Sequence, residues 1–274
     1  MINLVCCYPN LIIWELCPLK NTKQLQDIYN RVGVINQKKE LVIPDSPGRW
    51  GELNESFRLP PSITSFALSY QKEFLADKHN LDTFENIAQL EFYDKVHYKY
   101  FNRRDVGEIT DFIINFSKKL NSHPNDICVL SLSIDIIREI DFIYRKRTKE
   151  KSYITSETQE FHNKLSQQYL NNVPNSSNEK NKKKFDSEIE IIRKNKKLHF
   201  WMNSGTIKFS TVHSFKGWEI KTLFLIVEKG NREVIRPELI YTGLTRCMNN
   251  LVILNIDDEQ LDSFMNKLDI VQHE

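Results

Sequence analysis

Three apolar runs in the second half of the chain are predicted to be buried strands. They are TIKFSTV (206–212), KTLFLIV (221–227) and NLVILNI (250–256). Each is short and rich in Val, Ile, Leu and Phe, and none divides clearly into an apolar and a polar face. Strands of that kind are typically covered on both sides. We therefore predict an α/β fold with a mainly parallel sheet flanked by helices.

Helical segments alternate with these and earlier strands. Residues 59–76 place Ile63, Phe66 and Tyr70 at helical spacing, with two prolines in the first turn, where a helix tolerates them. Further helices are predicted at 106–120, 134–146, 236–246 and 258–268, and further strands at 86–100 and 126–133. Residues 171–184 are polar and of low complexity, which predicts a loop.

Composition adds little to this picture. The chain has 274 residues, of which 40% are hydrophobic and 27% are charged, as in ordinary globular proteins. A net charge of +2 is too small to indicate a nucleic-acid partner by itself. Residues 179–199 hold eight Lys or Arg against four Asp or Glu. That local excess fits either a solvated helix face or a surface that contacts phosphates.

Cysteine usage and the N-terminal segment favour a cytoplasmic protein. Five cysteines (6, 7, 17, 128 and 247) are an odd number without the paired spacing of a disulfide framework or a zinc site. The first residues lack the basic start of a signal peptide, and no apolar run reaches the roughly 18 residues that a membrane span needs. The seven histidines are scattered. We predict reduced thiols, no metal site and no membrane partner.

A polar cluster follows the strand at 206–212. Its members are Thr211, His213, Ser214, Lys216, Gly217 and Glu219. In open parallel sheets ligands bind beyond the carboxyl ends of strands, where hydroxyl groups can donate to phosphate oxygens. Gly217 permits a sharp turn, and a carboxylate at 219 can accept a hydrogen bond from a ribose hydroxyl. An ordinary polar connection between two strands fits the same residues.

A second cluster comes at the end of the helix predicted at 236–246. Arg246 lies there, directly before the apolar run of the last strand. A cation at that place is favoured by the helix dipole. A guanidinium can also hold two phosphate oxygens at once. The residues alone leave both interpretations open.

Two segments, STVHSFKGWE and ELIYTGLTRCMNN, resemble motifs V and VI of the UvrD/Rep-type superfamily-one helicases. Those motifs are written T-[IV]-H-x-x-K-G-x-E and E-L-x-Y-x-x-x-T-R-A. Trp218 stands where Leu is usual, and Cys247 where Ala is usual. Upstream, LNESFRLPPSITSFA resembles motif IV, with Arg58 in the place of its arginine. The resemblance spans roughly residues 55–257.

The resemblance implies the second RecA-like motor domain of a helicase. Such domains close with a first domain on ATP, while single-stranded nucleic acid crosses both. Arg58 and Arg246 would be the catalytic arginines at the γ-phosphate, a role worth about 10³–10⁵ in rate. The nucleotide would contact Lys216, Gly217 and Glu219. The nucleic-acid backbone would contact Thr211, His213 and Ser214.

The sequence contains no P-loop, G-x-x-x-x-G-K-[ST], and no Asp-Glu pair after an apolar strand. We therefore expect three parts: a remnant of a first RecA-like domain at 1–35, a linker at 36–55, and the helicase C-terminal domain at 56–274 with a basic insert at about 146–204. ATP and Mg²⁺ would be held mainly by a P-loop half elsewhere.

Three explanations of the missing P-loop remain open. The helicase is split between two chains, or this chain is truncated, or it is a catalytically silent subunit that binds protein or nucleic acid. The expected partners are single-stranded or partly duplex DNA, with RNA left open, and a protein that carries the P-loop domain. Alone, the chain should hydrolyse ATP very slowly or not at all.

Overall fold

The computed structural model describes residues 59–75, 93–169, 178–230, 237–268 and 270–273. The predicted remnant at 1–35, the predicted linker at 36–55 and Arg58 lie outside the described residues. So do residues 86–92 of the strand predicted at 86–100.

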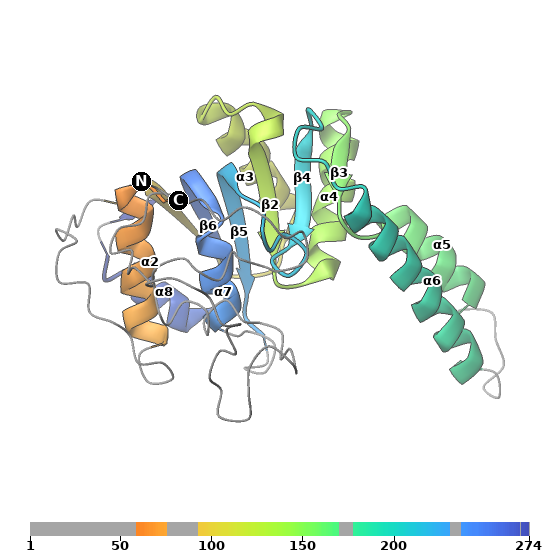
Figure 1. Ribbon diagram of the computed structural model, residues 1–274. Coiled ribbons are helices and arrows are strands. Elements are labelled where there is room, and N and C mark those ends of the chain that lie inside the picture. The colour runs from red at the N-terminus through yellow and green to blue at the C-terminus, as the bar shows by residue number, and fades with distance from the viewer. Residues whose placement is uncertain (1–58, 76–92, 170–177, 231–236, 269, 274) are drawn as a thin grey trace, which may run out of the picture.

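The described residues form one sheet of seven parallel strands in the order β3-β4-β2-β5-β6-β1-β7 (Figure 1). The strands are β1 (Tyr93–Phe101), β2 (Ile127–Ser131), β3 (Ser152–Ile154), β4 (Ile207–Thr211), β5 (Ile220–Glu228), β6 (Cys247–Ile256) and β7 (Ile270–Gln272). This confirms the predicted α/β fold, with a parallel sheet between helices.

Successive residues of the central strands enter two separate hydrophobic cores. On β5, Leu223 and Leu225 belong to one core, whereas Phe224 and Ile226 belong to the other. All four side chains are fully buried. The absence of a polar face in the predicted strands follows directly, because both faces of the sheet are covered.

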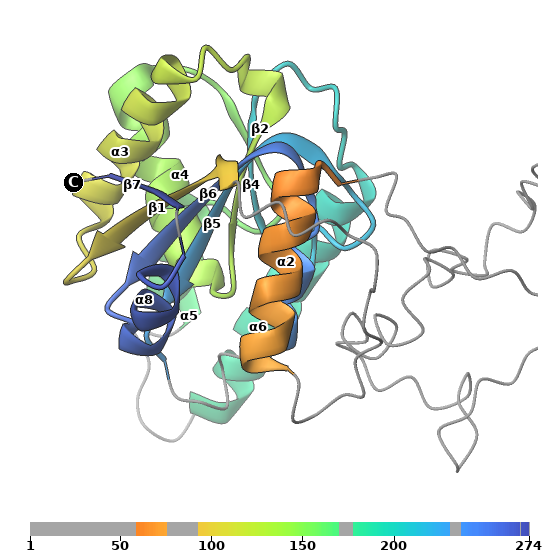
Figure 2. The same cartoon turned by 90° about the vertical axis from the view of Figure 1, so that its left-hand side faces the viewer.

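Helices cover the two faces (Figure 2). One face is covered by α2 (Pro61–Phe74), α7 (Pro237–Leu244) and α8 (Glu259–Met265). The other is covered by α3 (Val106–Lys119) and α4 (Ile134–Thr148). All five lie within or overlap the segments predicted to be helical, since their apolar residues recur at helical spacing and must be buried together.

Side-chain oxygens fix where three of the helices begin. The carboxylate of Asp105 accepts a hydrogen bond from the Glu108 amide at 3.0 Å, and the Ser133 hydroxyl accepts one from the Asp135 amide at 3.2 Å. Asp258 does the same for α8. Such caps satisfy amides that a helix cannot pair internally.

The chain between α4 and β4 holds α5 (Gln159–Tyr169) and α6 (Asn178–Leu198). These two helices pack side by side and project away from the sheet (Figure 1), and we call them the arm. Leu165 of α5 and Ile189 of α6 are buried. The ring of His162 contacts the ring of Phe185 edge-on, with 5.6 Å between the centroids. β3 precedes the arm and joins the sheet beside β4.

The prediction of a loop at 171–184 is wrong for residues 178–184, which form the first turns of α6. Lys and Glu are good helix formers, and this segment exposes nearly all of its side chains. A polar composition therefore did not distinguish a loop from an exposed helix. The three-residue strands β3 and β7 were not predicted either, because such short segments show no periodicity.

A buried carboxylate attaches the arm to the body of the protein. Glu157, 1% exposed, lies between Arg138 of α4 and Arg193 of α6. Arg193 donates two hydrogen bonds to it, at 2.7 and 2.8 Å, and Arg138 donates another. Burial raises the pKa of Glu157, but the hydrogen bonds from Arg193 and Arg138 outweigh it and hold the pKa below its usual value.

Replacement of Glu157 by Ala should lower the free energy of unfolding by about 3 kcal/mol, because Arg193 loses its carboxylate and the buried Arg138 keeps only the exposed Asp135 as an ionic partner. Urea denaturation measures the change. The matched control is Glu160→Ala, which removes an exposed carboxylate that pairs with Arg145 and should cost less than about 1 kcal/mol. Equal losses in the two variants would show that Glu157 does not hold the arm.

Two histidines pack together where β7 joins β1. The Nε2 atom of His273 lies 3.4 Å from Nδ1 of His97, and the ring of Phe116 contacts both. Burial, with the charges of His273 and Lys119 added, lowers the pKa of His97 from 6.5 to about 4. Burial also lowers the pKa of His273. Both rings are therefore neutral in the folded protein at neutral pH.

Stability should fall as the pH drops from about 6.5 to about 4, because the unfolded chain then binds protons that the folded pair does not. We expect a loss of about 1–2 kcal/mol, since solvent screens these half-buried rings. Unfolding in urea at several pH values measures it. His97→Gln should flatten the profile, and His199→Gln, at an exposed histidine, should leave it unchanged. A wild-type profile in His97→Gln would contradict this account.

Candidate functional site

Thr211 ends β4 and begins a tight turn. Its hydroxyl donates to the Ser214 hydroxyl at 3.0 Å and accepts from the Ser214 amide at 3.3 Å. The Phe215 amide donates to the Thr211 carbonyl at 3.0 Å. Thr211 is buried, and Phe215 is fully buried in the core. The Thr211 hydroxyl therefore holds the start of the loop in place.

The loop at 212–219 exposes one side and buries the other. Val212 and Phe215 point into the core, while His213, Ser214, Lys216 and Glu219 are half-buried. Gly217 is exposed and has a φ of 94°, a conformation that favours glycine. The next residue, Trp218, is 41% exposed. The predicted sharp turn at Gly217 is thus confirmed.

This loop carries the chain from one end of the sheet toward the other. Thr211 of β4 pairs with Ser131 of β2, and Ser131 pairs in turn with Ile226 of β5. β5 begins at Ile220, about 20 Å earlier along the strand at about 3.3 Å per residue. The residues of the polar cluster therefore lie toward both ends of the sheet. Thr211 ends β4, whereas Glu219 directly precedes the amino end of β5.

Glu219 and Arg246 directly precede two neighbouring strands, β5 and β6. The Ile220 amide donates to the Arg246 carbonyl at 3.0 Å, and Ile220 pairs with Cys247 in the parallel ladder. The two segments that were singled out in the sequence therefore meet at the amino ends of β5 and β6. The sequence placed them 27 residues apart, and only the strand pairing brings them together.

Arg246 is held by the end of its own helix. Its Nε donates to the Thr242 carbonyl at 3.2 Å, its amide donates to the Gly243 carbonyl at 3.0 Å, and the residue is 4% exposed. A cation at the carboxyl end of a helix is favoured by the helix dipole. These hydrogen bonds and the burial of the side chain hold the Nε atom of Arg246 in place at the end of α7.

Close packing brings α7 against β5 and the loop. A Cβ atom added at Gly243 would lie 2.9 Å from Leu225 Cδ1 and 3.3 Å from Val212 Cγ2. A side chain at that position would push the helix away from the strand. The close packing of α7 against β5 and the loop therefore requires a residue without a side chain at position 243. This packing positions Arg246, at the end of α7, relative to Ile220.

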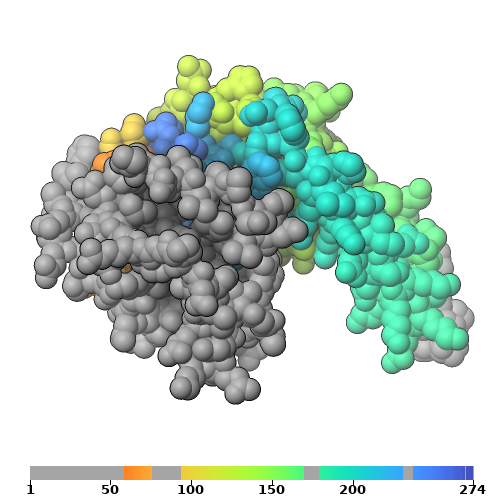
Figure 3. All heavy atoms as spheres, in the orientation of Figure 1, coloured from red at the N-terminus to blue at the C-terminus, as the bar shows by residue number. Residues whose placement is uncertain are grey.

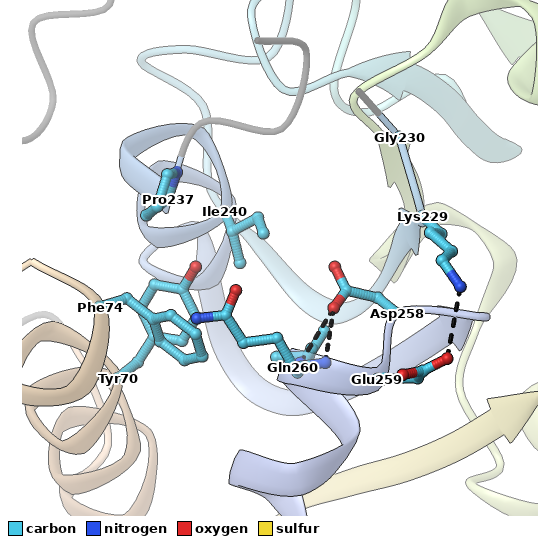
Figure 4. Close-up of a pocket in the computed structure, with 10 residues that line it drawn as sticks. Tyr70, Phe74, Lys229, Gly230, Pro237, Ile240, Asp258, Glu259 and Gln260 are labelled. Carbon is cyan, nitrogen blue, oxygen red and sulfur yellow. Dashed lines mark hydrogen bonds and ion pairs between the residues drawn. The ribbon is translucent and has the colours of Figure 1, made fainter. Parts of the chain in front are cut away.

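A hollow lies elsewhere, at the carboxyl ends of β5 and β6 (Figure 4). It encloses about 310 Å³ and is lined by Tyr70, Phe74, Lys229, Gly230, Pro237, Ile240, Asp258, Glu259, Gln260 and Leu261. Lys229 is paired with Asp257 and Glu259, and Asp258 caps α8. None of the predicted site residues that the structure describes lines it.

The described residues contain no group of three or more His, Cys, Asp or Glu side chains that could hold a metal ion. Cys128 and Cys247 are buried free thiols, and burial raises the pKa of each. No helix within the described ranges is both long enough and apolar enough to span a bilayer.

The likeness of this chain to a known protein that can be described is weak. No protein-family model matches the chain, and no curated protein matches it in sequence. A similar solved structure is described as the C-terminal domain of a possible DNA helicase from Lactobacillus plantarum WCFS1. It is 12% identical, with a TM-score of 0.41, and the similarity covers 74% of this chain and 89% of that one. A likeness at this level carries no argument about function.

Sequence reasoning overlooked one set of exposed aromatic residues near this loop. Phe200 and Trp201 follow the basic end of α6, and Phe200 contacts Trp218 with ring centroids 5.3 Å apart. Two signals were available in the sequence. One was the aromatic pair Phe200-Trp201 shortly after the lysines at 194–197, and the other was Trp218 in a position where the resemblance leads one to expect Leu.

Replacement of Gly217 by Ala should lower the free energy of unfolding by about 1 kcal/mol, because an L side chain is strained at this positive φ. Gly217→Asn is the matched variant and should lose less, since Asn tolerates positive φ better than Ala. Thermal unfolding compares the two. A larger loss in the Asn variant would mean that space, and not the backbone conformation, requires glycine here.

Proposed function

We propose that this chain supplies the second motor domain of a UvrD/Rep-type, ATP-dependent DNA helicase or translocase. The P-loop that holds ATP and Mg²⁺ would come from another chain or from a segment outside this sequence. Arg246 and Arg58 would stabilise the γ-phosphoryl group, and Lys216, Gly217 and Glu219 would form the nucleotide-binding side of this half. Thr211, His213 and Ser214 would face the nucleic-acid backbone.

The observation that carries this proposal is the meeting of two segments at one edge of the sheet. Glu219 and Arg246 directly precede paired strand residues, joined by the hydrogen bond from the Ile220 amide to the Arg246 carbonyl. An acceptor for a ribose hydroxyl and a cation for phosphates must lie within one nucleotide length of each other. Adjacent strands about 4.8 Å apart satisfy that requirement.

Arg246 suits charge stabilisation because its attachment is rigid. Its Nε is bound to the end of α7, and α7 is packed closely on β5 through Gly243. A preorganised cation stabilises developing negative charge without having to reorganise during the reaction. An arginine delivered across an interface contributes only when the two halves close, which couples hydrolysis to domain movement.

One observation favours a second candidate function. Arg246 is 4% exposed, so the folded chain does not present its guanidinium openly to a nucleotide. A catalytically silent subunit, which binds nucleic acid or protein within a larger complex, would keep the same fold with the arginine in a structural role. The two candidates differ in whether the Arg246 side chain affects ATP hydrolysis.

The test is ATP hydrolysis by the assembled complex. The tagged chain is purified from the cells that encode it, and any P-loop protein bound to it is identified and then co-expressed. With Arg246→Ala, the rate should fall about 10³-fold or more, because the γ-phosphoryl charge loses its cation. Glu219→Gln should instead raise the KM for ATP, because a contact to the bound nucleotide is weakened.

Arg103→Ala is the control, since that arginine side chain is 76% exposed and lies outside both motifs, and it should leave the rate unchanged. Circular dichroism and thermal unfolding establish that each variant is folded. A complex that hydrolyses ATP equally well with Ala at 246 and at 58 would contradict the motor proposal. The absence of a P-loop domain both from the bound proteins and from the rest of the gene product would also contradict it.

A further inference from the structure

Aromatic side chains gather where the arm meets the sheet. The Phe200 ring contacts Tyr153 and Trp218 edge-on, each at 5.3 Å between centroids, and the buried Phe215 at 6.1 Å. Trp201 follows Phe200 in the chain. We call Tyr153, Phe200, Trp201 and Trp218 the aromatic patch. It joins β3, the segment after α6 and the loop at 212–219.

The two tryptophans of the patch face solvent. Trp201 is 62% exposed and Trp218 is 41% exposed, although Trp is generally among the well-buried residues. Leu198, 72% exposed, lies three residues before Trp201 in the sequence. Trp218 packs against Phe200, the residue before Trp201, so large apolar groups remain exposed around this contact, as is typical of a binding surface.

The patch is held rigidly to the sheet. The Tyr153 hydroxyl hydrogen-bonds to the His199 carbonyl at 2.7 Å and lies 3.0 Å from the Lys196 carbonyl. Because Tyr153 belongs to β3, the segment that carries Phe200 cannot move independently of the sheet. Trp218 follows the turn at Gly217 and rests against Phe200. A fixed ring loses little conformational entropy on binding a flat partner.

The segment that leads into the aromatic patch is positively charged. Lys194 and Lys197 are exposed, and Lys196 places its Nζ 6.0 Å from the centre of the Tyr153 ring. Residues 194–201 contain three lysines and no acidic residue. Glu219 is the one carboxylate of the neighbouring loop. Figure 3 shows the atoms of α6 extending away from the body of the protein.

We propose that Trp201 and Trp218 form a stacking platform for unpaired bases of single-stranded nucleic acid, while Lys194 and Lys197 bind the flanking phosphates. Flat rings beside cations are what a single strand requires, because every base has a stackable face and every nucleotide carries a negative charge. A protein partner that binds through an apolar surface would not require so many lysines beside the aromatic rings. The inference deepens the proposed function and rests on it for the nucleic-acid partner.

Binding of a fluorescein-labelled 15-nucleotide oligo-dT to the full chain, measured by anisotropy, tests the platform. Trp201→Ala and Trp218→Ala should each weaken binding about five- to 100-fold, because a stacked base contributes about 1–3 kcal/mol. An oligonucleotide of the same length with abasic sites should bind all variants equally. Trp218→Phe should restore most of the affinity. An oligo-rU of equal length shows whether RNA is accepted.

The matched control for the tryptophans is Phe161→Ala, an aromatic side chain on α5 that is 40% exposed and lies outside the patch. For the phosphates, Lys197→Ala and Lys194→Ala should each reduce the dependence of log K on log salt by about 0.7, as expected for a single strand. Lys118→Ala, at an exposed lysine of α3, should leave that slope unchanged.

Three results would overturn the platform. The chain binds neither oligo-dT nor oligo-rU, or the tryptophan variants bind oligo-dT as well as the wild type does. In the third, these variants bind oligo-dT normally but lose the P-loop partner, which would make the patch a protein interface. The ATPase test with Arg246→Ala uses no residue of the patch, so the failure of one proposal is distinguishable from the failure of the other.

Discussion

The structure depends on covering both faces of one parallel sheet. Each central strand sends alternate side chains into two cores, so that Leu225 and Phe224 of β5 are buried on opposite sides. Such a sheet has no face left for a ligand, and every crossover must pack on one side or the other. Chemistry is therefore confined to the ends of the strands and to the loops that leave them.

The two ends of the sheet are used differently. At the amino ends of β5 and β6, the backbone of Arg246 is bonded to that of Ile220, which places two charged side chains at one edge. At the carboxyl ends lies a hollow whose charged groups are already engaged, Lys229 with Glu259 and Asp258 as a helix cap. The compact loop at 212–219 joins the two ends, since its buried Phe215 anchors it over the sheet.

The arm is stabilised on a different principle from the body. Few of its side chains reach a core, and its position depends on Glu157 between Arg138 and Arg193. An ion pair of this kind adds little net stability compared with apolar packing, but it permits only one geometry. That geometry sets Phe200 against Trp218, so that the arm and the loop present one surface.

The sequence by itself determined the α/β class, the longer strands and helices, and the turn at Gly217, because these follow from local periodicity and backbone chemistry. It also indicated the segments that carry Glu219 and Arg246. It did not determine β3, β7 or the start of α6, whose short or polar segments lack a periodic signal. Tertiary structure alone decided that Thr211 and Glu219 lie toward opposite ends of the sheet, that Glu219 and Arg246 are neighbours, and that Trp218 meets Phe200. Those relations arise from strand order and from buried contacts between residues far apart in the chain, which no local pattern encodes.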